Sequence, residues 1–368
     1  MVNFARELIA IPTENPPGNG YIAAQQAILR RLRTLGFQDV RSAGDCVMAF
    51  VGAGKPIIYF SGHYDVVPAQ APAQFEPQIK GTNLFGRGSA DMKAGLAAMT
   101  YAAVALRDSS TLLNGRIGLV FVPDEETAGP RGSRYLEAQG LLGEDAVAML
   151  TPEPTGGVIW NANRGAISLQ VTVRGKTAHV GRQVEGINAF ERMLAVAGAV
   201  TELKREVELR TTSYCIAPDA LRRSILMLGG QCVSGTGFNV VPDSCSFTID
   251  RRINPEEDFE EEKRRLMDLL KDTEVEILQE GAAAGTAEGA PVARALAAAI
   301  HRITGREPKF ELCPGLLETR FYASRGIPAL AYGPGLLTVS HGPHEFVSID
   351  RMVECAAIYA ETAAASLR

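Results

Sequence analysis

Apolar and polar positions in the first third of the chain alternate between helix-like and strand-like patterns. Residues 22–35 show a helical spacing of apolar side chains, and residues 95–106 form an alanine-rich helical segment. Two short apolar runs, residues 57–60 and 116–122, have the length and the β-branched and aromatic content of buried strands. Strands that alternate with helices predict a mainly parallel sheet covered on both faces. Ligands of such sheets gather beyond the carboxyl ends of the strands.

The pattern changes near residue 166 to the alternation of a strand with one solvated face. Apolar residues occupy every second position of 167–173, and the same alternation recurs at 245–249. Between and after these strands, we predict a helix at 186–207, a strand at 224–228, an acidic helix with Asn254 as its N-cap and Pro255 at its first position, and a strand at 275–278. The order β-α-β-β-α-β is that of a ferredoxin-like module.

The α/β texture resumes after a hinge of small residues at 281–285. A helical pattern covers residues 292–303, and an apolar run covers 327–332. We therefore predict an α/β fold in which a mainly parallel-sheet domain, residues 1–165 and 282–368, is interrupted by an inserted ferredoxin-like α+β domain, residues 166–281.

Length and charge narrow the class of protein. The 368 residues exceed what one hydrophobic core usually spans, which favours two domains. A net charge of -5 and the lack of a basic run give no electrostatic basis for binding nucleic acid or an anionic membrane surface. No apolar stretch approaches the ~20 residues of a membrane-spanning helix. The charged N-terminal residues lack the pattern of a secretion signal, and the six cysteines are scattered without C-x-x-C spacing, so a reducing cytoplasm is the expected location.

Five short segments place histidines or carboxylates at or just after apolar, strand-like runs. They are residues 61–65 (SGHYD), 89–91 (SAD), 123–126 (PDEE), 151–154 (TPEP) and 340–345 (SHGPHE). Carboxylate oxygens mixed with imidazole suit a borderline divalent cation such as zinc, and the surplus of carboxylates suggests two cations that share a bridging ligand. Read alone, each segment also fits a solvated loop, or a helix N-cap in the case of Asp91.

Together and in this order, the motifs SGHYDVVP (61–68), GRGSADMKAG (86–95) and DEET (124–127) resemble the M20 family of metallopeptidases and deacylases. This family includes acetylornithine deacetylase, succinyl-diaminopimelate desuccinylase, aminoacylase and bacterial glutamate carboxypeptidase. The resemblance covers nearly the whole chain, and it implies a zinc-peptidase catalytic domain with an inserted lid and dimerisation domain.

The resemblance also implies roles for single residues. Asp91 would bridge two divalent cations, with zinc favoured and cobalt or manganese as alternatives. His63 and Glu153 would complete one site, and Glu126 and His341 the other. Glu125, next to a ligand, would be the general base. Asp65 would accept the second ring N–H of His63 and fix its tautomer.

Further matches lie in the inserted domain. His179, in GKTAH (175–179), matches the lid histidine that stabilises the oxyanion and that can come from a partner subunit. Arg252 and Asn239 match positions that hold the substrate carboxylate or carbonyl, and Arg164 is a weaker candidate for the same task. The resemblance further implies a homodimer formed through this domain.

The last segment leaves a choice between two histidines, and two other stretches depart from the family pattern. His341 matches the family's histidine ligand, whereas His344 stands where asparagine or aspartate is usual, so a swap of roles between these two histidines stays open. The chain reads GLLET at 315–319 where a Gly-Thr-Asp-like string is common, and it lacks proline at Gln183 and Val184. These departures concern the substrate pocket and not the hydrolytic chemistry.

We therefore expect a metal-dependent hydrolase that removes an acyl group from a small N-acyl amino acid. A dipeptidase or a glutamate-type carboxypeptidase with the same binuclear centre is the alternative within the enzyme class. A metal-binding protein without turnover is the alternative from another class, although the intact Glu125 argues against it.

Overall fold

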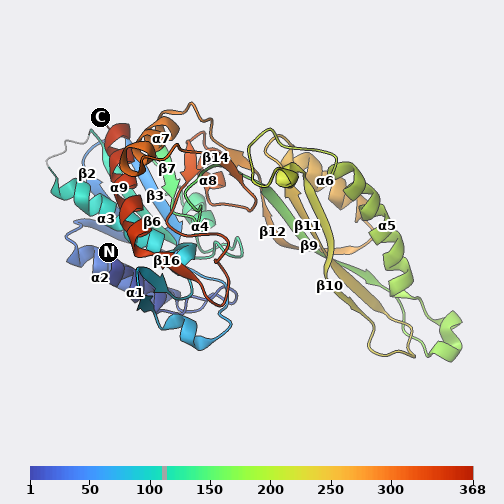
Figure 1. The fold of residues 1–368 in the computed structure, drawn as a ribbon. Coiled ribbons are helices and arrows are strands. Elements are labelled where there is room, and N and C mark those ends of the chain that lie inside the picture. Colours follow the sequence, from blue (N-terminus) through green and yellow to red (C-terminus); the bar gives the residue numbers. More distant parts are fainter. Residues whose placement is uncertain (110–113, 368) are drawn as a thin grey trace. The chain divides into compact units, whose positions relative to one another are not determined.

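A computed structural model describes residues 1–109 and 114–367 (Figure 1). The chain forms two compact units. Unit 1 contains Met1–Asn161, Gly285–Glu311 and Leu317–Arg368, and unit 2 contains Ala162–Ala284 and Leu312–Leu316. Within the described residues, no helix is long and apolar enough to span a membrane.

A nine-stranded mixed sheet organises unit 1. At its centre, β3 pairs in parallel with both β6 and β7, and β7 pairs in parallel with β15, whereas β1, β2 and β8 join in antiparallel fashion. The strand bounds are β1 (Asp39–Ala43), β2 (Cys46–Gly52), β3 (Ile57–His63), β6 (Arg116–Val122), β7 (Ala146–Thr151), β8 (Ile159–Asn163), β13 (Ala284–Gly285), β14 (Phe310–Cys313) and β15 (Ala329–Ala331). The predicted mixed α/β fold with a parallel sheet at its centre is confirmed.

Helices cover both faces of this sheet, because the side chains of its central strands alternate between the two faces and nearly all of them are buried. In β3, Ile58 and Phe60 belong to the apolar cluster that also contains residues of five helices, whereas Ile57 and Tyr59 belong to the cluster on the other face. The first face carries α1 (Val2–Ile9), α2 (Tyr21–Thr34), α3 (Ala94–Asp108), α7 (Pro291–Thr304) and α9 (Ile349–Ser366), and the second carries α4 (Ser133–Ala138) and α8 (Thr319–Ala323). A separate three-stranded sheet contains β4 (Gln78–Lys80), β5 (Asn83–Phe85) and β16 (Phe346–Ser348).

Unit 2 is an antiparallel sheet with two helices on one face. Its strand order is β10-β11-β9-β12, and its elements follow one another as β9-α5-β10-β11-α6-β12. The bounds are β9 (Gly165–Arg174), α5 (Ala189–Val207), β10 (Ile225–Ser234), β11 (Ser244–Ile253), α6 (Phe259–Leu269) and β12 (Glu274–Gly281). The alternating residues Ile167, Leu169, Val171 and Val173 form one core with both helices.

The predicted start of the acidic helix is wrong by one turn. Helix α6 begins at Phe259, and the side chain of Asp258 caps it by accepting the N–H of Glu261 at 2.8 Å. Asn254 cannot cap because its side-chain oxygen accepts from Nε of Arg164 at 3.0 Å and its amide donates to the carbonyl of Arg222 at 3.2 Å. Capping depends on which acceptor is free, and tertiary contacts decide that.

A second difference concerns the helix predicted from residue 186. Helix α5 starts at Ala189, where Asn188 accepts the N–H groups of Phe190 and Glu191. The preceding Ile187 pairs with Lys176 in an isolated β-bridge, which withdraws residues 186–188 from the helix.

We expect Arg251→Met to lower the free energy of unfolding of the protein. The fully buried Arg251 guanidinium contacts Glu262 at 2.7 Å and Glu257 at 2.6 Å. Removing one partner of a buried pair costs about 3–5 kcal/mol, and we expect the lower end because Arg210 still contacts both carboxylates. Urea unfolding measures the change. Arg174→Met, which breaks an exposed and solvent-screened pair with Glu274, should leave the free energy of unfolding nearly unchanged and serves as the control.

Candidate metal centre

The strands of the parallel core deliver three of the sequence-predicted segments to one edge of the sheet. His63 is the last residue of β3, Glu125 and Glu126 follow β6, and Glu153 follows β7. Because β3, β6 and β7 run parallel, their carboxyl ends lie at the same edge. Asp91 comes from the short turn Ser89–Lys93 that precedes α3.

Asp91 lies between two histidines. Its Oδ1 is 3.2 Å from Nε2 of His63, and its Oδ2 is 3.3 Å from Nε2 of His341. Burial alone would raise the pKa of the Asp91 carboxyl, but its hydrogen bonds to His341 and His63 hold this pKa below its usual range. Each carboxylate oxygen thus faces a different imidazole, which is the arrangement that a bridging carboxylate needs.

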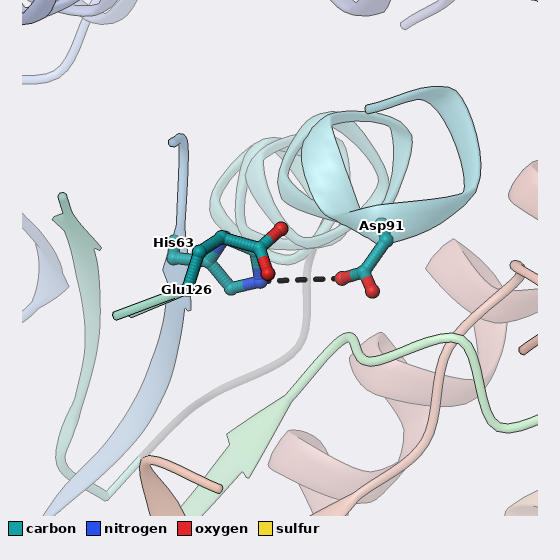
Figure 2. A group of neighbouring side chains, drawn as sticks. All are labelled: His63, Asp91 and Glu126. Atoms are coloured by element: carbon teal, nitrogen blue, oxygen red, sulfur yellow. Dashed lines mark hydrogen bonds and ion pairs between the residues drawn. The ribbon is translucent and has the colours of Figure 1, made fainter. Parts of the chain in front are cut away.

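Glu126 completes the cluster. His63, Asp91 and Glu126 each offer a ligand atom, and these three atoms lie within 4.8 Å of one another (Figure 2). Oε2 of Glu126 is also 3.5 Å from Nε2 of His341. Two imidazoles and several carboxylates at such distances fit divalent cations of borderline hardness.

Glu153 is buried, and its Oε1 has no hydrogen-bond partner among the described residues. Burial, and then the negative charge of Asp91, raise the pKa of the Glu153 carboxyl to about 8. A buried, unpartnered carboxylate oxygen is costly unless a cation or a proton neutralises it. The orphaned oxygen therefore fits a metal ligand, and the donor set as a whole fits the cations that the sequence predicts.

Asp65 connects His63 to the loop that carries the two glutamates. Its carboxylate accepts the N–H groups of Glu125 at 3.3 Å and of Glu126 at 3.2 Å, and the side-chain amide of Asn15 at 2.9 Å. Nδ1 of His63 lies 3.0 Å from the Asp65 carbonyl and 3.5 Å from its carboxylate. The backbone oxygen of Asp65 is therefore the nearer acceptor for the ring N–H, while Nε2 stays directed at Asp91.

Glu125 lies beside this cluster without belonging to it. Its Oε2 is 4.0 Å from Nε2 of His63. Burial raises the pKa of the Glu125 carboxyl well above its usual range, the charge of His63 lowers it, and the charge of Glu153 raises it again. A carboxyl group in this position can exchange a proton with a neighbouring water without being a ligand itself.

Sequence reasoning missed Glu318 and Arg320. Both are buried, Nη2 of Arg320 is 3.6 Å from Oε1 of Glu318, and burial raises the pKa of Glu318 to about 7. Oε2 of Glu318 has no hydrogen-bond partner among the described residues. The sequence signal that could have found them is the stretch at 315–319, which departs from the family pattern. It contains Glu318 after two leucines, and Arg320 follows it directly.

Two glycines permit the backbone segments of the ligands to approach closely. A Cβ atom on Gly333 would lie 2.3 Å from the carbonyl oxygen of Glu153, and one on Gly335 would lie 2.2 Å from that of Ala90. Larger residues at these positions would displace the segments that carry Glu153 and Asp91.

The two histidines of the last segment occupy different surroundings. Nε2 of His341 contacts Asp91 and Glu126, as given above. His344 is exposed and lines a surface cleft of about 270 Å³ with Gln74, Lys80 and Phe85. This geometry favours His341 as the ligand.

Four predicted residues belong to unit 2. His179 and Asn239 are exposed neighbours, since His179 forms a β-bridge with Val240 and the Asn239 carbonyl accepts the N–H of Val180 at 2.9 Å. Nδ1 of His179 accepts the N–H of Gly181 at 3.1 Å, so the neutral ring carries its hydrogen on Nε2.

The two arginines already have protein partners. Arg252 forms hydrogen bonds of 2.6 and 3.0 Å to Asp250. Arg164 is fully buried, and its guanidinium donates to Asn254 and to the carbonyls of Leu221 and Arg223. These contacts tie the start of β9 to residues 221–223 and leave Arg252 the more accessible of the two.

The chain is similar to known proteins over nearly its whole length. A family model described as peptidase family M20/M25/M40 matches residues 59–365. The chain belongs to this family. The succinyl-diaminopimelate desuccinylase of Thioalkalivibrio sulfidiphilus is similar to it at 30% identity, over 97% of this chain and 96% of that protein. The family resemblance stated from the motifs is confirmed, and this M20 protein is a metal-dependent hydrolase of linear amide or peptide bonds.

Solved structures share the fold at lower identity. An M20 metallo-carboxypeptidase from Sulfolobus solfataricus has a TM-score of 0.80 at 18% identity, covering 99% of this chain and 98% of that one. The dipeptidase Dug1p from Saccharomyces cerevisiae has a TM-score of 0.78 at 16% identity, with coverages of 99% and 95%. The YXEP protein of Bacillus subtilis, described as a dinuclear metal-binding peptidase of family M20, has a TM-score of 0.68 at 16% identity, with coverages of 100% and 97%. At these identities the likeness establishes the fold alone.

We expect metal binding to this M20 protein to release protons and to weaken as the pH falls. Hydrogen bonds to Asp91 and Glu126 raise the pKa of His341 to about 10, and burial raises that of Glu153 to about 8. Both groups are thus protonated in the metal-free protein at pH 7, and a cation bound by these two side chains would have to displace their protons. Titration calorimetry in buffers of different ionisation enthalpy should show release of about two protons or more. Equal affinities at pH 6 and pH 8 would contradict this assignment.

Proposed function

We propose that this M20 enzyme removes a short dicarboxylic acyl group, of which succinyl is the type, from the amino group of a small amino acid. The observation that carries the proposal is the position of Asp91, whose two oxygens face His63 and His341 beside the carboxylate of Glu126. The nearly full-length similarity to a succinyl-diaminopimelate desuccinylase supports the acyl class.

We assign the two cation sites as follows. His63, Glu153 and Asp91 would hold one divalent cation, and Glu126, His341 and Asp91 the other. The mixture of imidazole and carboxylate donors favours zinc, with cobalt or manganese as alternatives. The dinuclear M20 structure from Bacillus subtilis supports a count of two.

Bound cations would lower the pKa of a water molecule and polarise the scissile carbonyl. Glu125 would accept a proton from an attacking water molecule and deliver it to the leaving nitrogen. The carboxylate of Asp65 would help to keep Glu125 in place, because it accepts a hydrogen bond from the backbone N–H of Glu125. The Nε2–H of His179 would donate to the developing oxyanion. Arg252 and Asn239 are the proposed contacts of the substrate carboxylate or carbonyl, and Arg164 is the weaker candidate because its buried guanidinium already donates to Asn254 and to the carbonyls of Leu221 and Arg223.

We propose that residues 1–165 and 282–368 form the catalytic domain and residues 166–281 a lid, and the division of the chain into two compact units supports this proposal. We propose that the lid also forms a homodimer. β10 is an edge strand, and Phe190 and Leu194 of α5 and Val233 of β10 expose apolar surface around a groove of about 380 Å³. Light scattering on Leu194→Glu, compared with the unaltered protein, tests this dimer. We propose the reducing cytoplasm as its location, because the six cysteines are scattered along the sequence without C-x-x-C spacing.

Mass spectrometry of a substrate panel tests the function. The zinc-loaded enzyme is incubated with N-succinyl amino acids, N-acetyl amino acids and dipeptides, and kcat/KM is measured for each. We expect the N-succinyl compounds to be cleaved fastest. Preferential cleavage of dipeptides would instead support the dipeptidase alternative, and inertness toward all three classes would support a metal-binding protein without turnover.

A further inference from the structure

A buried ion pair joins two segments of unit 1 that carry proposed metal ligands. Nη1 of Arg87 lies 2.6 Å from Oε2 of Glu345, and each side chain is only 1% exposed. The two residues are 258 positions apart in the sequence. Arg87 precedes the turn that holds Asp91, and Glu345 follows the loop that holds His341.

Glu345 restrains the backbone at Asp91. Its Oε1 accepts the N–H of Ala90 at 2.9 Å and the N–H of Asp91 at 3.1 Å, while its Oε2 contacts Arg87. All these contacts are buried, so water does not weaken them. The Glu345 carboxylate therefore fixes where the backbone of Asp91 lies.

Arg87 restrains the backbone at His341. Its Nη2 donates to the His341 carbonyl at 3.1 Å and to Oε1 of Gln70 at 2.8 Å, and Nε2 of Gln70 donates to the same His341 carbonyl at 2.9 Å. His341 needs such support because it lies in a loop, its side chain is 48% exposed, and its φ of 63° is in the left-handed region that side-chain-bearing residues rarely adopt.

We infer that the Arg87–Glu345 pair positions Asp91 relative to His341 and thereby sets the affinity of the second cation. The inference rests on the proposed assignment of the two cation sites. The pair acts mainly on the second site, because its contacts reach both Asp91 and His341 of that site but only the shared Asp91 of the first. Both residues are positioning residues, since their side chains act through the backbone of the ligands.

Two variants separate this role from a general contribution to folding. Glu345→Gln keeps the size of the side chain and one acceptor, but it removes the charge that faces Arg87. Arg87→Lys keeps the charge, but a single ammonium group cannot contact both Glu345 and the His341 carbonyl as the guanidinium does. Glu262→Gln is the matched control, because Glu262 is a buried partner of an arginine in unit 2 and contacts no proposed ligand.

The experiment measures zinc stoichiometry and both dissociation constants by competition with a chelator, together with thermal unfolding in excess chelator. We expect both variants to bind the second cation about 10–100-fold more weakly, the range typical of partners that orient metal ligands. The first dissociation constant should change less, because of the ligands of the first site only the shared Asp91 is contacted by the pair. Glu262→Gln should lower the unfolding temperature and leave both dissociation constants as in the unaltered protein.

A second substitution in the same protein, which removes a ligand of one cation site, identifies the cation site that the pair affects. Combined with His63→Ala, which removes a ligand of the first site, Glu345→Gln should still weaken the remaining cation. Combined with His341→Ala, it should add little, because the interaction that it perturbs is already lost. Unaltered binding of both cations by Glu345→Gln and Arg87→Lys would overturn the inference and leave the proposed function intact. Failure of the unaltered protein to bind two cations would instead refute the site assignment.

Discussion

Replacing Asp91 by asparagine is expected to reduce turnover on the order of 10³-fold or more, because the variant loses the ligand that we propose both cations share. The asparagine side chain keeps one carbonyl oxygen, so it can serve at most one of the two sites that face His63 and His341. Metal catalysis contributes several kcal/mol of transition-state stabilisation, and each 1.36 kcal/mol corresponds to a factor of ten in rate. Elemental analysis after dialysis should find one cation or fewer per chain.

The control for this variant is an aspartate in an ordinary ion pair. Asp39→Asn interrupts an exposed contact with Arg41 in β1 and should change neither metal content nor turnover. An Asp91→Asn protein that keeps two tightly bound cations would show that Asp91 is not the bridge.

Most residues of the candidate centre could be predicted from the sequence, because the proposed ligands come in short segments attached to strongly patterned strands. His63 and the Glu125–Glu126 pair lie at the ends of apolar runs whose parallel pairing follows from the alternation of strands and helices. Once β3, β6 and β7 are predicted to be parallel, the edge at which their polar residues meet is determined.

The parts that could not be predicted depend on pairings between distant side chains. No residue near Asn254 in the sequence indicates that Arg164 donates to its side-chain oxygen. The sequence therefore could not show that Asp258, and not Asn254, caps the helix. Likewise, Arg87 and Glu345 lie inside or beside recognised motifs, but only the folded chain shows that they form a pair. Such contacts have no local signal, because each partner alone is compatible with a solvated surface residue.

Glu318 illustrates the same limit at the centre itself. Its charge raises the pKa values of Glu125 and Glu153, so it forms part of the electrostatic environment of the proposed base and of one proposed ligand. The sequence showed only an unusual stretch at 315–319. Burial of a carboxyl beside a metal centre arises from how α8 packs against the sheet, and periodicity does not report that packing.

Glu125→Gln is expected to lower kcat about 10²–10⁴-fold, the usual contribution of a positioned general base, while both cations stay bound. Glutamine has nearly the same shape and burial, but its amide cannot accept the proton that water must lose. The hydrogen bond from the backbone N–H of residue 125 to Asp65 does not involve the side chain, so the loop and Glu126 should keep their positions.

The informative comparison is Glu153→Gln, which changes another buried carboxylate of the same centre. Because we assign Glu153 as a ligand, its variant should lose activity together with metal, whereas Glu125→Gln should lose activity alone. Metal content and kcat measured on the same preparations separate the two outcomes. If Glu125→Gln released a cation, Glu125 would be a ligand and the base would have to be sought elsewhere, with the buried Glu318 as the next candidate.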